Sequence, residues 1–127
     1  MSEQQAVPPT AMCGELLRVV RAWESDRLVR VLVLYGELAI DTLPIARAEV
    51  AAAEDDAWPV LVLDLSQLNY VDSAGVQLVL LAQHTAHEAN RRLVVLLGHG
   101  FTRRVFDMLG ITGRLDVLDT ETPAPRD

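Results

Sequence analysis

Apolar and polar segments alternate along the chain with the lengths expected of strands and helices. Two segments rich in branched apolar residues, 16–23 and 28–35, flank the polar residues 24–27 and predict an antiparallel hairpin. Residues 60–65 and 93–97 are continuous apolar runs, which are typical of strands in a parallel sheet. We expect the first of these two strands to be buried on both faces.

Two longer segments have the spacing of helices. The first follows Asp41 and Thr42, which form a plausible cap, and is expected to end near residues 55–56. The second starts at Asp72 and Ser73, and both residue types are common at helix N-caps. The apolar positions at helical spacing are Leu43, Ile45, Ala46, Val50 and Ala53 in the first helix and Val76, Val79 and Leu80 in the second.

The last part of the chain completes an α/β pattern. Thr102 and Gly110 predict the cap and the end of a short helix, and residues 115–118 predict a final short strand. Strands that alternate with helices in this way imply right-handed crossovers. We therefore expect a mostly parallel sheet of four to five strands, with an N-terminal antiparallel hairpin and helices packed against the sheet.

Length and composition limit the class of protein. The 127 residues suffice for one domain, which we expect at 14–118, between a disordered leader at 1–13 and a flexible tail at 119–127. The net charge of −7 argues against binding of nucleic acid or anionic lipid through a basic surface. Cys13 is the single cysteine, so no internal disulfide is possible. Every apolar run is shorter than a membrane span, and we expect a cytoplasmic protein.

One stretch carries a resemblance to a known family. Residues 61–82, LVLDLSQLNYVDSAGVQLVLLA, resemble the signature of STAS domains, in particular of anti-sigma factor antagonists. In that signature, a strand ending in Asp-Leu-Ser leads to Asp-Ser-Ser/Thr-Gly at a helix start. Residues 35–38 are similar to the family's Gly-Glu-Leu-Asp segment, and residues 104–111 to its late Arg-Leu-Phe segment. The resemblance covers about residues 15–118.

The resemblance implies a regulatory protein that is not an enzyme and holds no cofactor. In the family, the serine at the position of Ser73 is phosphorylated by an anti-sigma factor serine kinase, which binds the ATP. The unphosphorylated protein binds that kinase and thereby releases a sigma factor. A PP2C-type phosphatase removes the phosphate and resets the system. The sequence does not define the oligomeric state.

The residues themselves leave two interpretations of Ser73. From spacing alone, Asp72 or Ser73 is simply a helix cap. A helix N-terminus also favours negative charge, so a phosphate on Ser73 is chemically compatible with the position. The resemblance favours phosphorylation, with Asp72 as a cap or as an orienting group for the hydroxyl.

The expected partner-binding surface contains several departures from the family pattern. Ala74 stands where a second hydroxyl is common, Gln77 replaces a glycine, and Ala39 replaces an aspartate. Asp41 either supplies a polar group near Ser73 or only caps the next helix. Gly75 either permits a close backbone approach or is a neutral residue near the cap. The full set that we assign to partner binding is Asp72, Ser73, Ala74, Gly75, Gln77, Glu37 and Asp41.

Other interpretations are weaker. His84 and His87 lack a third ligand at suitable spacing for a metal site, and His99 is expected in a turn. A phosphoaspartate receiver needs a lysine, and the chain contains none. Two functional alternatives remain within the same family: an accessory subunit of an ABC-type transport complex, and a module that senses a small ligand.

Overall fold

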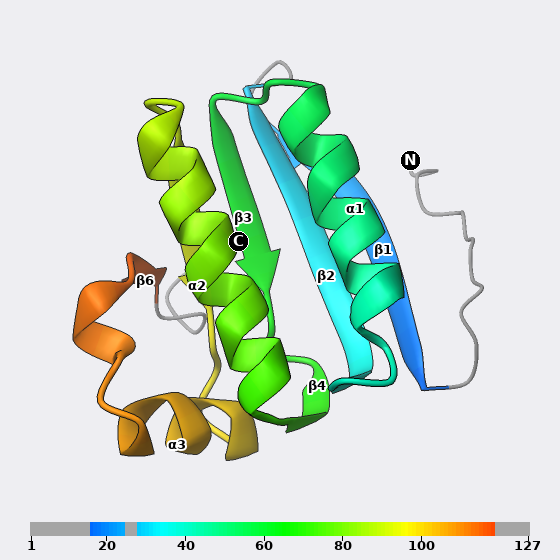
Figure 1. The fold of residues 1–127 in the computed structure, drawn as a ribbon, viewed down its shortest axis with the longest axis vertical. Coiled ribbons are helices and arrows are strands. Elements are labelled where there is room, and N and C mark those ends of the chain that lie inside the picture. The colour runs from blue at the N-terminus through cyan, green and yellow to red at the C-terminus, as the bar shows by residue number, and fades with distance from the viewer. Residues whose placement is uncertain (1–15, 25–27, 119–127) are drawn as a thin grey trace.

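A mixed sheet forms the centre of the molecule in the computed structural model, which describes residues 16–24 and 28–118 (Figure 1). The expected leader, the tail and the turn at 25–27 lie outside the described residues. Within them, the sheet has six strands in the order β1-β2-β3-β5-β6, with β4 paired to β2. The strands are β1 Leu17–Glu24, β2 Val29–Leu38, β3 Val60–Asp64, β4 Leu68–Val71, β5 Arg92–Leu96 and β6 Val117–Leu118.

Strand directions confirm the predicted α/β fold with its hairpin. β1 pairs with β2 in an antiparallel arrangement, with Leu17 opposite Gly36 and Glu24 opposite Val29. The pairs β2–β3, β2–β4, β3–β5 and β5–β6 are all parallel. The carboxyl ends of the parallel strands therefore lie at one edge of the sheet and their amino ends at the opposite edge.

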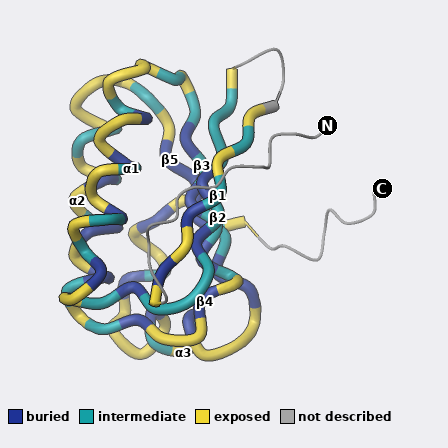
Figure 2. Tube along the Cα trace, turned by 90° about the vertical axis from the view of Figure 1, so that its right-hand side faces the viewer, coloured by how far each residue is buried: buried dark blue, intermediate teal, exposed yellow. Residues whose placement is uncertain are grey.

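Three helices connect the strands. They are α1 Leu43–Asp55, α2 Ser73–Glu88 and α3 Phe101–Met108, with a short 3-10 turn at Thr112–Arg114. α1 and α2 contact each other and lie side by side across one face of the sheet (Figures 1 and 2). α3 packs beside β4, at the edge where the parallel strands end. None of the helices within the described residues is long and apolar enough to cross a membrane.

The core lies between the sheet and this pair of helices. Alternate strand residues such as Leu32, Leu34, Leu61 and Leu63 are buried there and pack with apolar residues of α1 and α2. The expectation that β3 is buried on both faces is wrong, because its remaining residues are partly exposed. The physical reason is that α1 and α2 both cover the same face of the sheet.

Strand β4 is an element that the sequence pattern did not predict. β3 ends at Asp64, whose Oδ1 accepts hydrogen bonds from the Ser66 N–H at 3.0 Å and the Ser66 hydroxyl at 2.6 Å. This Asx-type turn redirects the chain. Residues 68–71 then pair with the end of β2, beyond the point where β3 stops. The sheet consequently has one strand more than the four to five expected.

Two of the predicted caps require correction. The residue that precedes α1 is Thr42, whose hydroxyl donates to the Glu37 carbonyl at 2.9 Å and accepts from the Ala39 N–H at 3.0 Å. Asp41 is exposed and is not the capping residue. α3 begins after Gly100, and Thr102 is buried inside its first turn. The Thr42 hydroxyl is thus hydrogen-bonded within the fold, and the Thr102 side chain is buried in it.

Candidate phosphorylation and partner-binding site

Ser73 is the first residue of α2 and is exposed to solvent. Its position follows from β4, which runs parallel to β2 and delivers the chain to the carboxyl edge of the sheet. The first backbone N–H groups of a helix lack intrahelical acceptors and favour negative charge. The Ser73 hydroxyl is therefore accessible from outside and lies where an added anion is tolerated.

Asp72 is the N-cap of α2 and fixes the surroundings of Ser73. Its Oδ1 accepts the Gly75 N–H at 3.0 Å, which confirms the predicted cap. Its Oδ2 accepts the Ile40 N–H at 3.2 Å, and its own N–H donates to the Leu38 carbonyl at 3.2 Å. The carboxylate therefore ties the loop after β2 to the start of α2.

Gly75 lies where no side chain fits. A Cβ built at this position would stand 2.5 Å from the Leu38 carbonyl oxygen and 2.9 Å from side-chain atoms of Leu38 and Val71. The first turn of α2 can pack against the end of β2 only because residue 75 lacks a side chain. This contact holds the helix start, and with it Ser73, close to the sheet edge.

The structure brings the other sequence-predicted residues to the same edge. Gln77 is exposed one turn into α2, and Ala74 is partly exposed. Glu37 is partly buried on β2, opposite Tyr70 of β4. Asp41 is exposed in the loop that Asp72 holds. The loop after β2 and the first turn of α2 thus form one continuous surface.

An aromatic pair beside this surface was not found from the sequence. Tyr70 and Phe101 stack with their ring centroids 6.1 Å apart and their planes 17° apart. Both side chains remain exposed, at 44% and 41%, and Ile40 is exposed at 67%. Exposed aromatic residues of this kind are common in protein interfaces. From the sequence alone, the pair was indicated only by one aromatic residue in each of two segments that were expected to be connections.

A phosphate on Ser73 would meet opposing electrostatic influences. The N-terminus of α2 stabilises an anion by about 0.3–1 kcal/mol, whereas the neighbouring Asp72 carboxylate carries the same charge sign as the phosphate. Both oxygens of Asp72 already accept backbone N–H groups. The phosphate would therefore extend into solvent and change the charge of the surface without entering the core.

The positions of the three histidines do not support a metal site. His84 and His87 are exposed on α2, and His99 lies in the turn before α3. Across residues 16–24 and 28–118, no three His, Cys, Asp or Glu side chains are grouped closely enough to hold a metal ion.

These features define a small α/β domain with an accessible serine at a helix start. The family model described as "Mlab, STAS domain" matches residues 16–119. The chain belongs to the STAS domain family, as the sequence motifs predicted.

A curated relative and several solved structures resemble the chain. BtrV of Bordetella bronchiseptica, which bears the name of an anti-sigma factor antagonist, is 32% identical over 77 residues, or 61% of this chain. The match covers 66% of that protein, just under two thirds of its length.

Among solved structures, an anti-sigma factor antagonist from Mycobacterium paratuberculosis has a TM-score of 0.69 and 22% identity, covering 80% of this chain and 84% of that one. Unphosphorylated SpoIIAA, also an anti-sigma factor antagonist, has a TM-score of 0.66 and 24% identity over 80% and 86% of the two chains. The Bacillus cell fate determinant SpoIIAA in its phosphorylated form gives 0.62 and 24%, over 80% and 89%. These similarities show the shared fold.

Proposed function

We propose that this protein is an anti-sigma factor antagonist that binds an anti-sigma factor serine kinase and is switched off by phosphorylation of Ser73. The observation that carries the proposal is the exposed Ser73 hydroxyl at the start of α2, within the family motif. The relative that is 32% identical bears the name of such an antagonist, which supports the same assignment.

The docking surface consists of the start of α2, the loop after β2 and the Tyr70–Phe101 pair. It combines exposed apolar groups, Ile40 among them, with polar backbone near Ser73. A partner that buries this surface holds the Ser73 hydroxyl against its own ATP. Gln77 is exposed one turn along α2, next to this docking surface. Its side chain, in place of the family's glycine, contributes to the choice of kinase.

Phosphoryl transfer then ends the interaction. The Ser73 oxygen forms a bond to the γ-phosphorus of ATP, the bond from that phosphorus to the β-phosphate oxygen breaks, and ADP leaves. The hydroxyl proton passes to a base of the kinase. The product carries about −1.5 to −2 additional charges at pH 7 on the docking surface. Binding weakens because a buried phosphate without partners is costly. A PP2C-type phosphatase restores the hydroxyl by hydrolysis.

The experiment is a phosphorylation assay with a candidate anti-sigma factor serine kinase from the same organism. The purified protein is incubated with that kinase and ATP, and the phosphate is located by mass spectrometry. We expect a single phosphorylated residue, Ser73, and no modification of the Ser73→Ala variant. Phosphate on the alanine variant would exclude Ser73 as the acceptor. Stable binding to a transport ATPase without any modification would instead favour an accessory subunit of a transport complex.

A further inference from the structure

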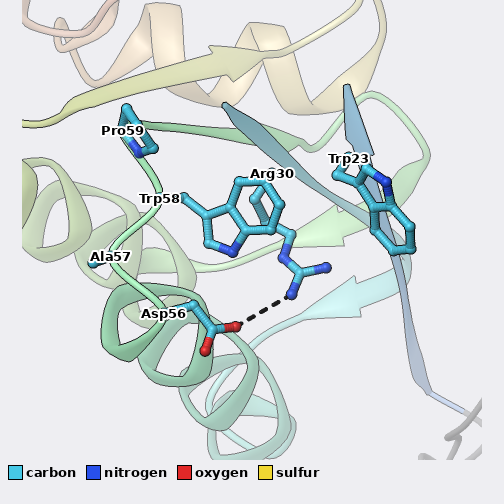
Figure 3. A pocket seen from close by; sticks show the side chains of 6 residues that line it. All are labelled: Trp23, Arg30, Asp56, Ala57, Trp58 and Pro59. Atoms are coloured by element: carbon cyan, nitrogen blue, oxygen red, sulfur yellow. Dashed lines mark hydrogen bonds and ion pairs between the residues drawn. The ribbon is translucent and has the colours of Figure 1, made fainter. Parts of the chain in front are cut away.

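Two tryptophans and an arginine line a surface hollow at the edge of the sheet opposite Ser73 (Figure 3). Its volume is about 430 Å³. The lining comes from the end of β1, the start of β2 and the connection from α1 to β3, which all lie at the amino ends of the parallel strands. The hollow is therefore separate from the site described above. It is lined by Trp23, Arg30, Asp56, Ala57, Trp58 and Pro59.

Arg30 occupies the centre of this hollow. Trp23 is its direct partner across the β1–β2 pair, so the two side chains lie on the same face of the hairpin. The Arg30 Cζ lies 4.8 Å from the centroid of the Trp58 ring. In Figure 3 the guanidinium lies between the two indole rings. The Arg30 side chain is only 13% exposed, so its charge is held in a largely apolar environment.

Two buried hydrogen-bond donors of this hollow are unpaired within the described part of the chain. Arg30 Nε and Trp58 Nε1 are both buried, and neither has an acceptor among the residues that the structure describes. The guanidinium forms an ion pair from Nη2 to Asp56 Oδ2 that is 3.4 Å long, and the Asp56 side chain is 58% exposed. Charge-assisted hydrogen bonds are usually about 2.7–2.9 Å long. An incoming acceptor would relieve buried donors whose lack of a partner is unfavourable.

The exposure of the lining indicates what kind of molecule binds. Trp23, Asp56, Ala57 and Pro59 are exposed, so the hollow is open at the surface and does not enclose a small molecule. Tryptophan and arginine dominate the binding energy of many protein interfaces. The two buried donors, one of them on a cation, call for a partner that supplies a negatively charged acceptor.

We propose that this hollow binds an acidic segment of a partner protein. One carboxylate of the segment accepts from Arg30 Nε and Trp58 Nε1, and a neighbouring apolar side chain packs on the exposed indole of Trp23. Because both nitrogens are covered in the free protein, the segment must open the hollow slightly as it enters. The proposal does not depend on Ser73 or on its phosphorylation.

Tryptophan fluorescence tests the proposal directly, because Trp23 and Trp58 are the chain's two tryptophans and both line the hollow. The full-length protein is titrated with the peptide acetyl-Gly-Glu-Phe-Gly-amide and with the matched peptide that has glutamine in place of glutamate. We expect a saturable change in emission with the glutamate peptide that weakens as salt is added. The glutamine peptide should bind about tenfold more weakly, since it lacks the charge-assisted hydrogen bonds.

Variants separate a role in binding from a role in folding. Arg30→Gln should weaken binding of the glutamate peptide about tenfold, whereas Arg47→Gln, an exposed arginine on α1, should not. If Arg30→Gln fails to fold, Trp58→Phe keeps a ring and removes only the N–H donor, and its affinity should still fall. Equal affinities for the two peptides, or no saturable change, would overturn the proposal. A change in emission on diluting the protein alone would assign the hollow to a second copy and overturn it as well.

The controls at Ser73 keep this test independent of the proposed function. Ser73→Ala and Ser73→Asp should bind the glutamate peptide as the unmodified protein does. Failure of peptide binding with normal phosphorylation of Ser73 would therefore refute only the acidic-segment site.

Discussion

Asp72 connects the end of β2 to the start of α2 through hydrogen bonds of both its backbone and its side chain. Its identity was predictable as a helix cap, because aspartate is favoured directly before a helix. Its second hydrogen bond, to Ile40, was not predictable, because it joins residues 32 positions apart. Asp72, which the sequence indicated as a cap or an orienting group for the Ser73 hydroxyl, thus also holds the loop after β2 to the start of α2.

Replacing Asp72 with alanine should destabilise the protein. The change removes the acceptor for the Gly75 N–H and the acceptor for the Ile40 N–H, and loss of a helix cap alone costs about 0.5–2 kcal/mol. We expect the midpoint of urea unfolding to fall accordingly. Asp72→Asn retains one acceptor oxygen and should lose less stability. Equal stability of the alanine variant and the unmodified protein would contradict the assigned role of the cap.

A methyl group at Gly75 should also be unfavourable. In an ordinary helix, exchange of glycine for alanine stabilises by about 0.5–1 kcal/mol. At this position the added Cβ would overlap the Leu38 carbonyl, so strain of about 1–3 kcal/mol should outweigh that gain. Gly113→Ala is the matched control, because a Cβ there meets nothing within 4 Å. If thermal unfolding showed Gly75→Ala to be the more stable protein, the close packing of α2 on β2 would be refuted.

Among the elements, the hydrophobic pattern predicted β1, β2, α1 and α2 from a regular apolar face and β5 from a continuous apolar run. It could not predict β4, whose four residues have only Leu68 and Val71 buried and do not alternate. That strand exists because β3 ends at Asp64 and leaves the last part of β2 free to pair. The Tyr70–Phe101 stack escaped prediction for a related reason, because it joins β4 to α3 across the fold.

Glu54 in the last turn of α1 provides a test of how α1 packs. Burial raises the pKa of the Glu54 carboxyl above its ordinary value of 4.5, an effect that Arg91 opposes and Asp55 adds to. The folded state therefore holds the proton more tightly than the unfolded state. As a result, this residue's contribution to stability declines as pH rises from about 4.5 through the raised pKa.

Glu54→Gln should remove this pH dependence. We expect the variant to gain stability relative to the unmodified protein as pH rises above 4.5, and to show little gain below it. The measurement is the free energy of unfolding in urea at several pH values. A relative gain that grew toward acidic pH would contradict the burial of this carboxyl.

At the scale of the whole molecule, the two surfaces lie at opposite ends of the sheet. The start of α2 is at the carboxyl edge, and the tryptophan-lined hollow is at the amino edge, beside the end of α1 (Figure 1). The sequence motif could locate the part of the first surface at the start of α2, because residues 72–77 are contiguous. It could not locate the second, because Trp23, Arg30 and Trp58 are brought together only by strand pairing and by the connection after α1.

This separation predicts that the phosphorylation switch is local. Phosphorylation of Ser73 should leave the emission spectrum of the two tryptophans and the temperature of unfolding nearly unchanged, because the serine is exposed and the core contacts remain. The comparison uses phosphorylated and unmodified protein at the same concentration. A clear shift in tryptophan emission would show that the modification rearranges the fold.

We propose that one exposed hydroxyl, that of Ser73, controls a protein contact through charge. The most direct test is calorimetric titration of the proposed partner, an anti-sigma factor serine kinase, with unmodified protein, Ser73-phosphorylated protein and the Ser73→Asp variant, at constant salt. A charge buried without a partner at an interface costs about 2–5 kcal/mol, so phosphorylation should weaken binding by about 30-fold or more. Ser73→Asp should weaken it in the same direction. Undiminished binding by the phosphorylated protein and by the aspartate variant would contradict the account.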